Sequence, residues 1–211
     1  MEIKINFGIY FELERVMNTI NRLDWYKENG YKVRLPKGIT KKSSEDKIEI
    51  QIKEEFNKEE FSEISTKIFT DLIKRELDFI EKISEVFKES VPKEIIIYLT
   101  NYGADSSYDL PNKIAYNINK KVGWKMIVHD IIDLLLVEKI KKYKVERWEK
   151  ERIVDMVLNS KEFKFLKYNH WQKDYEGTNL YIDDLFNKYF FSDNQYFFSK
   201  IEEARINFAK L

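Results

Sequence analysis

Four stretches of the chain have the polarity pattern of a β-strand. Residues 1–6 and 48–52 alternate apolar with polar positions, which predicts strands with one buried face. Residues 94–100 form an apolar, β-branched run that is suited to a central strand. Residues 113–119 alternate again after a loop around Gly103, and we expect them to form an edge strand.

Apolar residues at intervals of three and four positions predict helices in most of the remaining chain. One helix is expected after the first strand and ends before Asn29. Residues 59–87 predict one long helix or two abutting ones, and further helices are expected over 122–142, over 146–159 and from residue 181 onward. Because strands and helices do not alternate strictly, the order favours an α+β fold with a small mixed or antiparallel sheet packed against several helices.

The length of the chain favours a single domain. A chain of 211 residues can bury about 70 % of its surface without disulfides or metals as staples. We expect an N-terminal strand and helices over 1–90, core strands and motif-bearing helices over 91–160, and an aromatic helical tail over 161–211. Hydrophobic residues make up 43 % of the chain, with only 6 Gly and 3 Pro, which excludes a disordered or linker-rich protein.

Charge and cysteine content exclude further classes of function. The chain has 37 basic and 37 acidic residues, so no overall positive field exists and we expect no nucleic-acid partner. The absence of cysteine excludes disulfides, thiolate metal sites and cysteine nucleophiles. The N-terminus lacks a signal-peptide core, and the most apolar stretch, 126–137, has 12 residues where a membrane span needs about 20. We therefore expect a cytoplasmic protein with no membrane partner.

Polar residues interrupt this apolar stretch. His129 and Asp133 are four positions apart and share one helix face, with Asp130 one step round. On the next expected helix, Glu151 and Asp155 are also four apart and could face the first group. One imidazole with several carboxylates could hold a divalent metal, and the oxygen-rich set favours Mn, Fe or Mg more than a nitrogen-rich set would.

A metal-free arrangement is the alternative for the same residues. An unpartnered buried carboxylate is costly and must find a cation, a proton or several donors. His129, Asp133 and Glu151 could instead form a buried hydrogen-bond or salt-bridge network with Lys150, Arg152 or backbone groups.

The two motifs together resemble the gluzincin-type zinc metallopeptidases of the zincin fold. His129 to Asp133 (HDIID) stands where that family carries His-Glu-x-x-His, and Glu151 to Asp155 stands where it carries Glu-x-x-x-Asp. The resemblance implies that His129, Asp133 and Glu151 are metal ligands, that Asp130 takes the place of the catalytic general base, and that Asp155 orients a ligand from outside the ligand set. It covers about a third of the chain, roughly residues 94–159.

Two departures from the family pattern indicate a degenerate site. Asp130 is shorter than the family's glutamate by one carbon–carbon bond, about 1.5 Å, which draws the base away from the water it would activate. Asp133 replaces a neutral histidine with an anion, which should weaken zinc binding and oppose formation of hydroxide. The resemblance therefore implies a zincin-like protein with weakened or lost peptidase activity, holding one divalent metal, zinc or manganese, or none.

The resemblance also implies a binding partner, and other functions remain open beside it. An edge strand at 113–119 could pair with an extended peptide through backbone hydrogen bonds even without hydrolysis. An active metal-dependent hydrolase with a His/Asp/Glu site and a non-enzymatic interaction protein remain open as alternatives. The dipeptide His129-Asp130 also suggests an HD-type metal phosphohydrolase. Such an enzyme needs a histidine upstream of the dipeptide, and none precedes His129 in this chain. His170, Tyr168 and Tyr175 are candidate donors to a cleft beside the metal.

Overall fold

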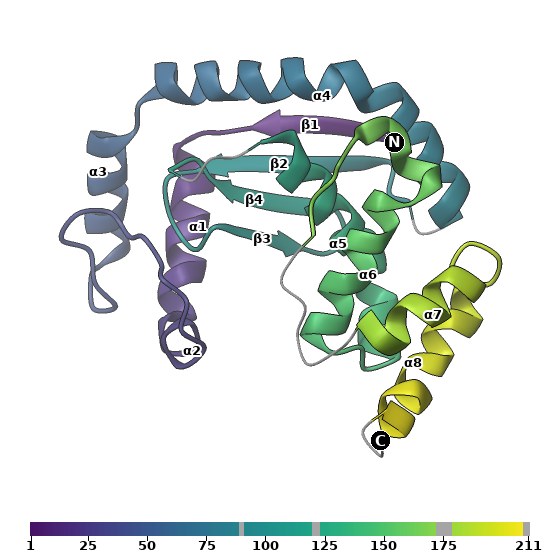
Figure 1. Cartoon of the computed structure of the whole chain (residues 1–211). Coiled ribbons are helices and arrows are strands. Elements are labelled where there is room, and N and C mark those ends of the chain that lie inside the picture. Colours follow the sequence, from purple (N-terminus) through teal and green to yellow (C-terminus); the bar gives the residue numbers. More distant parts are fainter. Residues whose placement is uncertain (89–90, 120–122, 172–178, 209–211) are drawn as a thin grey trace. The chain divides into compact units, whose positions relative to one another are not determined.

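The computed structural model describes residues 1–88, 91–119, 123–171 and 179–208 (Figure 1). The chain divides into two compact units. The sheet unit comprises Met1–Lys74 and Pro92–Ile127, and the helical unit comprises Arg75–Val91 and Val128–Leu211. The expected α+β class is confirmed, and the expectation of a single domain stays a prediction.

Four strands form one mixed sheet in the sheet unit. They are β1 (Glu2–Asn6), β2 (Glu94–Thr100), β3 (Ser106–Asp109) and β4 (Lys113–Asn117), in the spatial order β1-β2-β4-β3. β1, β2 and β4 are parallel, and β3 is antiparallel to β4. β2 lies inside the sheet between β1 and β4, as its apolar run predicts. Ile95, Ile97 and Leu99 on one of its faces are fully buried, whereas Tyr98 on the other face is only partly buried.

The prediction that residues 113–119 form an edge strand is wrong. β4 lies between β2 and β3, and β3 ends the sheet. The short polar segment Ser106–Asp109 carries no apolar pattern, yet it pairs along its whole length with β4. β4 alternates because Ile114 and Tyr116 are buried on one face while the other face borders a hollow, not because the strand is at an edge.

The prediction of a strand over 48–52 is also wrong. These residues belong to α3 (Glu45–Glu55), in which Ile48 and Ile52 are 1 % and 0 % exposed and Ile50 is 59 % exposed. In a strand, all three would share a face, whereas in a helix only positions four apart do. Ser44 supplies the helix start, because its side chain accepts a hydrogen bond from the Lys47 N–H.

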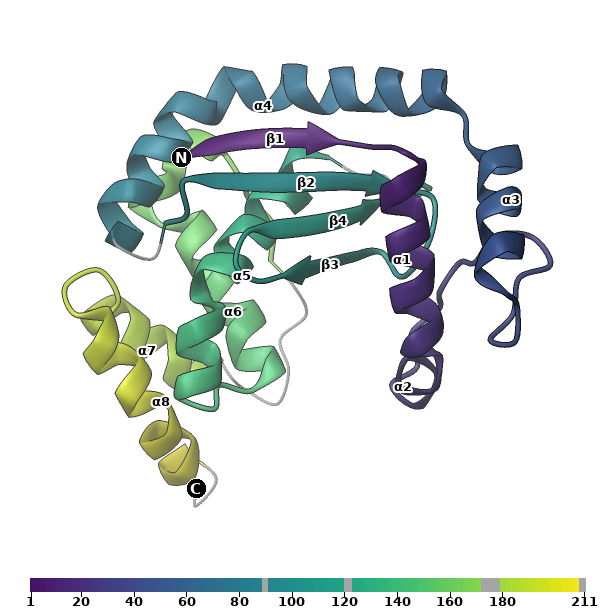
Figure 2. The same ribbon diagram turned by 180° about the vertical axis from the view of Figure 1, so that it is seen from behind.

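Two further helices complete this end of the sheet unit. β1 leads directly into α1 (Ile9–Asn21), which is followed by α2 (Leu23–Glu28). Figure 2 shows α1 crossing the strands near the carboxyl ends of β2 and β4. On its side away from the sheet, buried Val16 and Ile20 of α1 pack with the isoleucines of α3.

The remaining elements are helical. α4 (Lys58–Phe87) is one continuous helix of 30 residues, which is the first of the two arrangements that its apolar spacing allows. α5 (Trp124–Lys142) and α6 (Arg147–Asn159) also form where expected, and a 3₁₀ helix, η2 (Lys161–Leu166), follows. Both α4 and α5 begin in the sheet unit and end in the helical unit.

The aromatic tail forms two helices, α7 (Asn179–Tyr189) and α8 (Asn194–Phe208). Its aromatic rings pack against one another, with Phe190 4.5 Å from Phe186 and 5.3 Å from Phe197 between ring centroids. Among the described residues, none of the helices has the length and apolar character that a membrane crossing requires.

Candidate metal centre

The middle of α5 places three ligand-type side chains together within the helical unit. His129 and Asp133 are 9 % and 3 % exposed, and Asp130 is partly buried beside them. One ligand atom from each of the three lies within 4.8 Å of the others. The surrounding positions of the helix are apolar and nearly inaccessible (Val128, Ile131, Ile132, Leu134). This buried His/Asp group could hold a metal ion.

α6 lies beside α5 (Figure 1) and contributes a lysine and a glutamate to the same cluster. The Lys150 ammonium lies 2.6 Å from Asp133 Oδ2 and 2.9 Å from Glu151 Oε1. His129 lies between two carboxylates, with Nδ1 3.5 Å from Asp130 Oδ1 and Nε2 3.5 Å from Glu151 Oε2. Part of the metal-free alternative is therefore seen, namely the ion pairs with Lys150.

Two carboxylate oxygens of the cluster have no hydrogen-bond partner within the described residues. They are Asp130 Oδ2 and Asp133 Oδ1, and both are buried. A buried polar atom without a partner is unfavourable by roughly 1–3 kcal/mol, and more for a charged group. These oxygens are the ones that Lys150 does not reach, so the cluster retains capacity for a cation after Lys150 is counted.

Burial and charge both alter protonation in the cluster. Burial raises the pKa of Asp133 to about 6, and the Glu151 charge adds to this rise while the Lys150 charge opposes it. Burial alone would lower the pKa of His129. The hydrogen bond to Asp130 and the negative charges of Asp133 and Glu151 outweigh it, so the pKa of His129 is raised. The cluster as a whole is an environment that favours positive charge.

The other predicted residues lie at different depths. Asp155 is buried on α6, one turn beyond Glu151. Tyr168 is also buried, and burial followed by the negative charge of Asp155 raises its pKa. The His170 side chain is exposed, and its backbone oxygen accepts a hydrogen bond from Asn159 Nδ2. Tyr175 lies outside the described residues.

Arg152, the other cation of the metal-free alternative, makes an ion pair away from the cluster. Its Nε and Nη2 donate to Asp183 on α7 at 2.8 and 2.6 Å, and its guanidinium lies 4.5 Å from the centre of the Trp171 ring. Lys150, one of the two cations named for that alternative, is paired with both Asp133 and Glu151.

Sequence reasoning missed a second polar group, which lies in the sheet unit. Arg15, on α1, reaches Ser107 on β3, and both line a hollow on the sheet. A row of polar side chains, Glu14, Arg15 and Asn18 on the helix and Arg22 at its end, could have revealed it.

Comparison of the chain with models of protein families, with curated proteins and with solved structures returned no match.

Proposed function

We propose that the chain is a zincin-like protein that binds one divalent metal through His129, Asp130 and Asp133 and has weak or no peptidase activity. The observation that carries the proposal is the pair of buried oxygens, Asp130 Oδ2 and Asp133 Oδ1, that lack hydrogen-bond partners within the described residues, beside an imidazole. A cation coordinated by both carboxylates would supply the missing partner for each of these oxygens. In addition, the helix bearing HDIID follows a mixed sheet and precedes the helix bearing Glu151, the chain order that the resemblance implies.

The same geometry explains why hydrolysis should be weak. In this arrangement Asp130 is a ligand-type group within the cluster, so it is not free to act as a general base. Glu151 is held by Lys150, which leaves it less available as a third ligand. When bound, a metal here would supply positive charge to a cluster of carboxylates. Zinc is the metal that the resemblance implies, and manganese is the one that oxygen ligands favour.

Metal content tests the proposal directly. The protein is purified without chelator and its metal content is measured by elemental analysis, and stripped protein is then titrated with zinc and with manganese chloride. We expect about one metal per chain, and a loss of binding on His129→Ala and on Asp130→Ala. Asp184→Ala, at an exposed carboxylate on α7, is the matched control and should leave binding unchanged. Stripped wild-type protein that binds neither metal would overturn the proposal.

A second candidate is a metal-free interaction protein with an ion-paired core, and the position of Lys150 favours it. The Lys150→Met variant separates the two candidates. If the centre binds metal, loss of the competing ammonium should increase metal affinity, because Asp133 Oδ2 and Glu151 Oε1 become available. If the centre is a closed ion-pair network, the variant should lose stability and still bind no metal, because buried Asp133 and partly buried Glu151 lose their ion pairs with Lys150.

The proposal includes the binding of an extended peptide, at the edge strand β3 in place of residues 113–119. Because β3 ends the sheet beside β4, an extended peptide would pair with β3. Asn117 donates its N–H to Asp105 O, so in the alternating antiparallel pattern the backbone groups of Ser106 face away from β4. A fluorescent, permanently unfolded polypeptide should therefore bind more weakly to Ser106→Pro than to Ser106→Ala. Equal binding would argue against strand pairing.

A further inference from the structure

The sheet unit contains a hollow between α1 and the exposed face of the sheet. It encloses about 610 Å³, including space open to solvent. The register explains why it is there: Tyr98 on β2, Ala115 on β4 and Ser107 on β3 lie in one row across the sheet. Two small side chains beside a large one leave a depression next to the tyrosine ring. α1 covers the Tyr98 end of this row, where the Phe11 and Tyr98 ring centroids are 4.2 Å apart.

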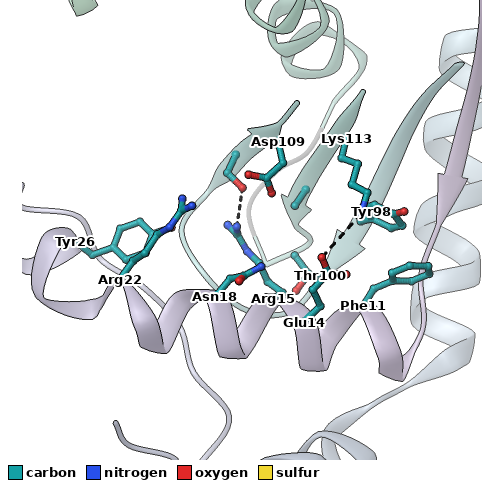
Figure 3. Close-up of a pocket in the computed structure, with 12 residues that line it drawn as sticks. Phe11, Glu14, Arg15, Asn18, Arg22, Tyr26, Tyr98, Thr100, Asp109 and Lys113 are labelled. Atoms are coloured by element: carbon teal, nitrogen blue, oxygen red, sulfur yellow. Dashed lines mark hydrogen bonds and ion pairs between the residues drawn. The ribbon is translucent and has the colours of Figure 1, made fainter. Parts of the chain in front are cut away.

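Arg15 lies at the centre of the hollow (Figure 3). Its Nη1 donates to Ser107 Oγ at 2.6 Å, and its Nε lies 3.5 Å from the Tyr102 backbone oxygen. Gly103 allows this position, because a Cβ there would lie 2.3 Å from Arg15 Nε. Its Nη2 is buried and has no hydrogen-bond partner within the described residues. The negative charges of Asp109 and Glu12 act on Arg15 without forming an ion pair with it in this part of the chain.

Other charges around the hollow favour an anion. Figure 3 shows Arg22 and Asn18 on the same side of α1 as Arg15. Lys113 is the third cation, 4.0 Å from Glu14 and 5.7 Å from the centre of the Tyr98 ring. Three cations face two carboxylates, Glu14 and Asp109, so the lining has a net charge of +1. Burial lowers the pKa of Arg15, which shows that its charge is poorly solvated.

We propose that this hollow binds a small organic anion, with a carboxylate or phosphate head near Arg15 and Arg22 and a ring or other apolar group against Tyr98 and Phe11. Guanidinium groups match both kinds of head with paired hydrogen bonds. The aromatic pair supplies the apolar wall beside them. The lining belongs wholly to the sheet unit, so the inference is independent of the metal proposed at His129.

Four probes separate the contributions of head and ring. Phenyl phosphate and benzoate carry a ring, whereas inorganic phosphate and acetate do not. Each is titrated into the ¹⁵N-labelled full chain, and binding is followed by amide shifts in NMR spectra. We expect at least one ring-bearing probe to shift Gly103 and Ser107 amides and to bind at least about tenfold more tightly than its ring-free counterpart. The preferred head identifies the ligand as a carboxylate or a phosphate ester.

Variants decide whether the charges of the hollow are responsible. Arg22→Gln changes an exposed position and should weaken binding about fivefold or more. Lys67→Gln, at an exposed position of α4 outside the lining, is the matched control and should have no effect. Arg15→Lys should also weaken binding, because it keeps the charge and loses the paired geometry. The proposal would be overturned if no probe shifted these amides at millimolar concentration. It would also be overturned if Arg22→Gln and Arg15→Lys bound the probes as tightly as the Lys67→Gln control.

Discussion

A single buried carboxylate, Glu12, shows how burial sets a protonation state in this protein. It accepts hydrogen bonds from Thr100 Oγ1 and from the Asn101 N–H, and so ties α1 to the end of β2. Burial nevertheless raises its pKa to about 7, despite those bonds and the nearby positive charge of Arg15. The desolvation of the charged form is thus larger than the effect of its hydrogen bonds.

Glu12 should make stability depend on pH. A glutamate in the unfolded chain loses its proton near its ordinary pKa of 4.5, whereas the folded protein keeps it up to about 7. Folded protein therefore binds more protons in that interval, and the free energy of unfolding should fall as pH rises from about 5 to 7.5, by about 3 kcal/mol at most. Urea unfolding at a series of pH values checks this.

The Glu12→Gln variant is the control for that titration. Asp133 also has a raised pKa and contributes a loss in the same direction. The slope of stability against pH should therefore become smaller in Glu12→Gln without vanishing. An unchanged slope would show that Glu12 does not titrate in this range.

The two departures from the family motif can be reversed at the residue scale. In the Asp130→Glu, Asp133→His double variant, residue 133 adds a second imidazole to that of His129, at the spacing of the His-Glu-x-x-His motif. We expect zinc affinity to rise at least about tenfold, equivalent to about 1.4 kcal/mol of binding free energy, as measured by calorimetry. Circular dichroism checks that the variant is folded. A folded variant with unchanged zinc affinity would speak against the zincin resemblance.

At the scale of elements, one ion pair joins α6 to α8. Glu149 is 0 % exposed, and Arg205 donates to its two oxygens at 2.8 and 2.7 Å. The Tyr181 hydroxyl adds a third hydrogen bond, and the N–H of Glu146 adds a fourth as part of a capping box. The start of α6, and with it Lys150 and Glu151, is held by this network.

Removal of Arg205 should destabilise the protein strongly. Arg205→Ala leaves a fully buried carboxylate without its counter-ion, which typically lowers the free energy of unfolding by about 3–5 kcal/mol. Partial exposure of Arg205 places the expected loss near the lower value, about 3 kcal/mol. Urea unfolding gives the measurement, and Lys200→Ala, which removes a surface ion pair on the same helix, should leave the free energy of unfolding nearly unchanged.

The sequence predicts elements well where apolar spacing is long and regular, and poorly where it is short. α4 and β2 follow from ten or more consistent positions and from an unbroken β-branched run. β3 could not be predicted, since Ser106–Asp109 has no apolar residue except Tyr108, and its strand state depends on pairing with β4. The isoleucines at 48, 50 and 52 suggested the two-residue period of a strand, although they belong to helix α3. The sequence does not distinguish the exposed Ile50 from its buried neighbours.

Part of the candidate site could also be predicted from a regular apolar pattern. Polar groups inside the apolar run of α5 reveal His129 and Asp133, and their four-residue spacing gives the shared face. The partner of Asp133 was harder to predict, because Lys150 and Arg152 are two positions apart in sequence and only the orientation of α6 selects Lys150. The hollow at Arg15 depends on the register between strands, which cannot be predicted from a local sequence pattern.

At the scale of the whole molecule, charge balance should dominate solution behaviour. The formal net charge is 0 at pH 7 and the sequence pI is about 6.8. Little electrostatic repulsion between copies is then expected near neutral pH. We predict a minimum of solubility close to pH 7, measured by precipitation with polyethylene glycol, and a rise on either side. A flat profile between about pH 5.5 and about pH 8.5 would contradict this.

The continuity of α4 and α5 limits how the protein can be divided for experiments. The boundary between the units falls at Lys74 within α4 and at Ile127 within α5. A fragment containing one unit would therefore carry severed helix stubs, whose newly exposed N–H and C=O groups and apolar side chains are unfavourable in water. Samples for spectroscopy should keep the polypeptide whole and isolate each centre by substitution instead.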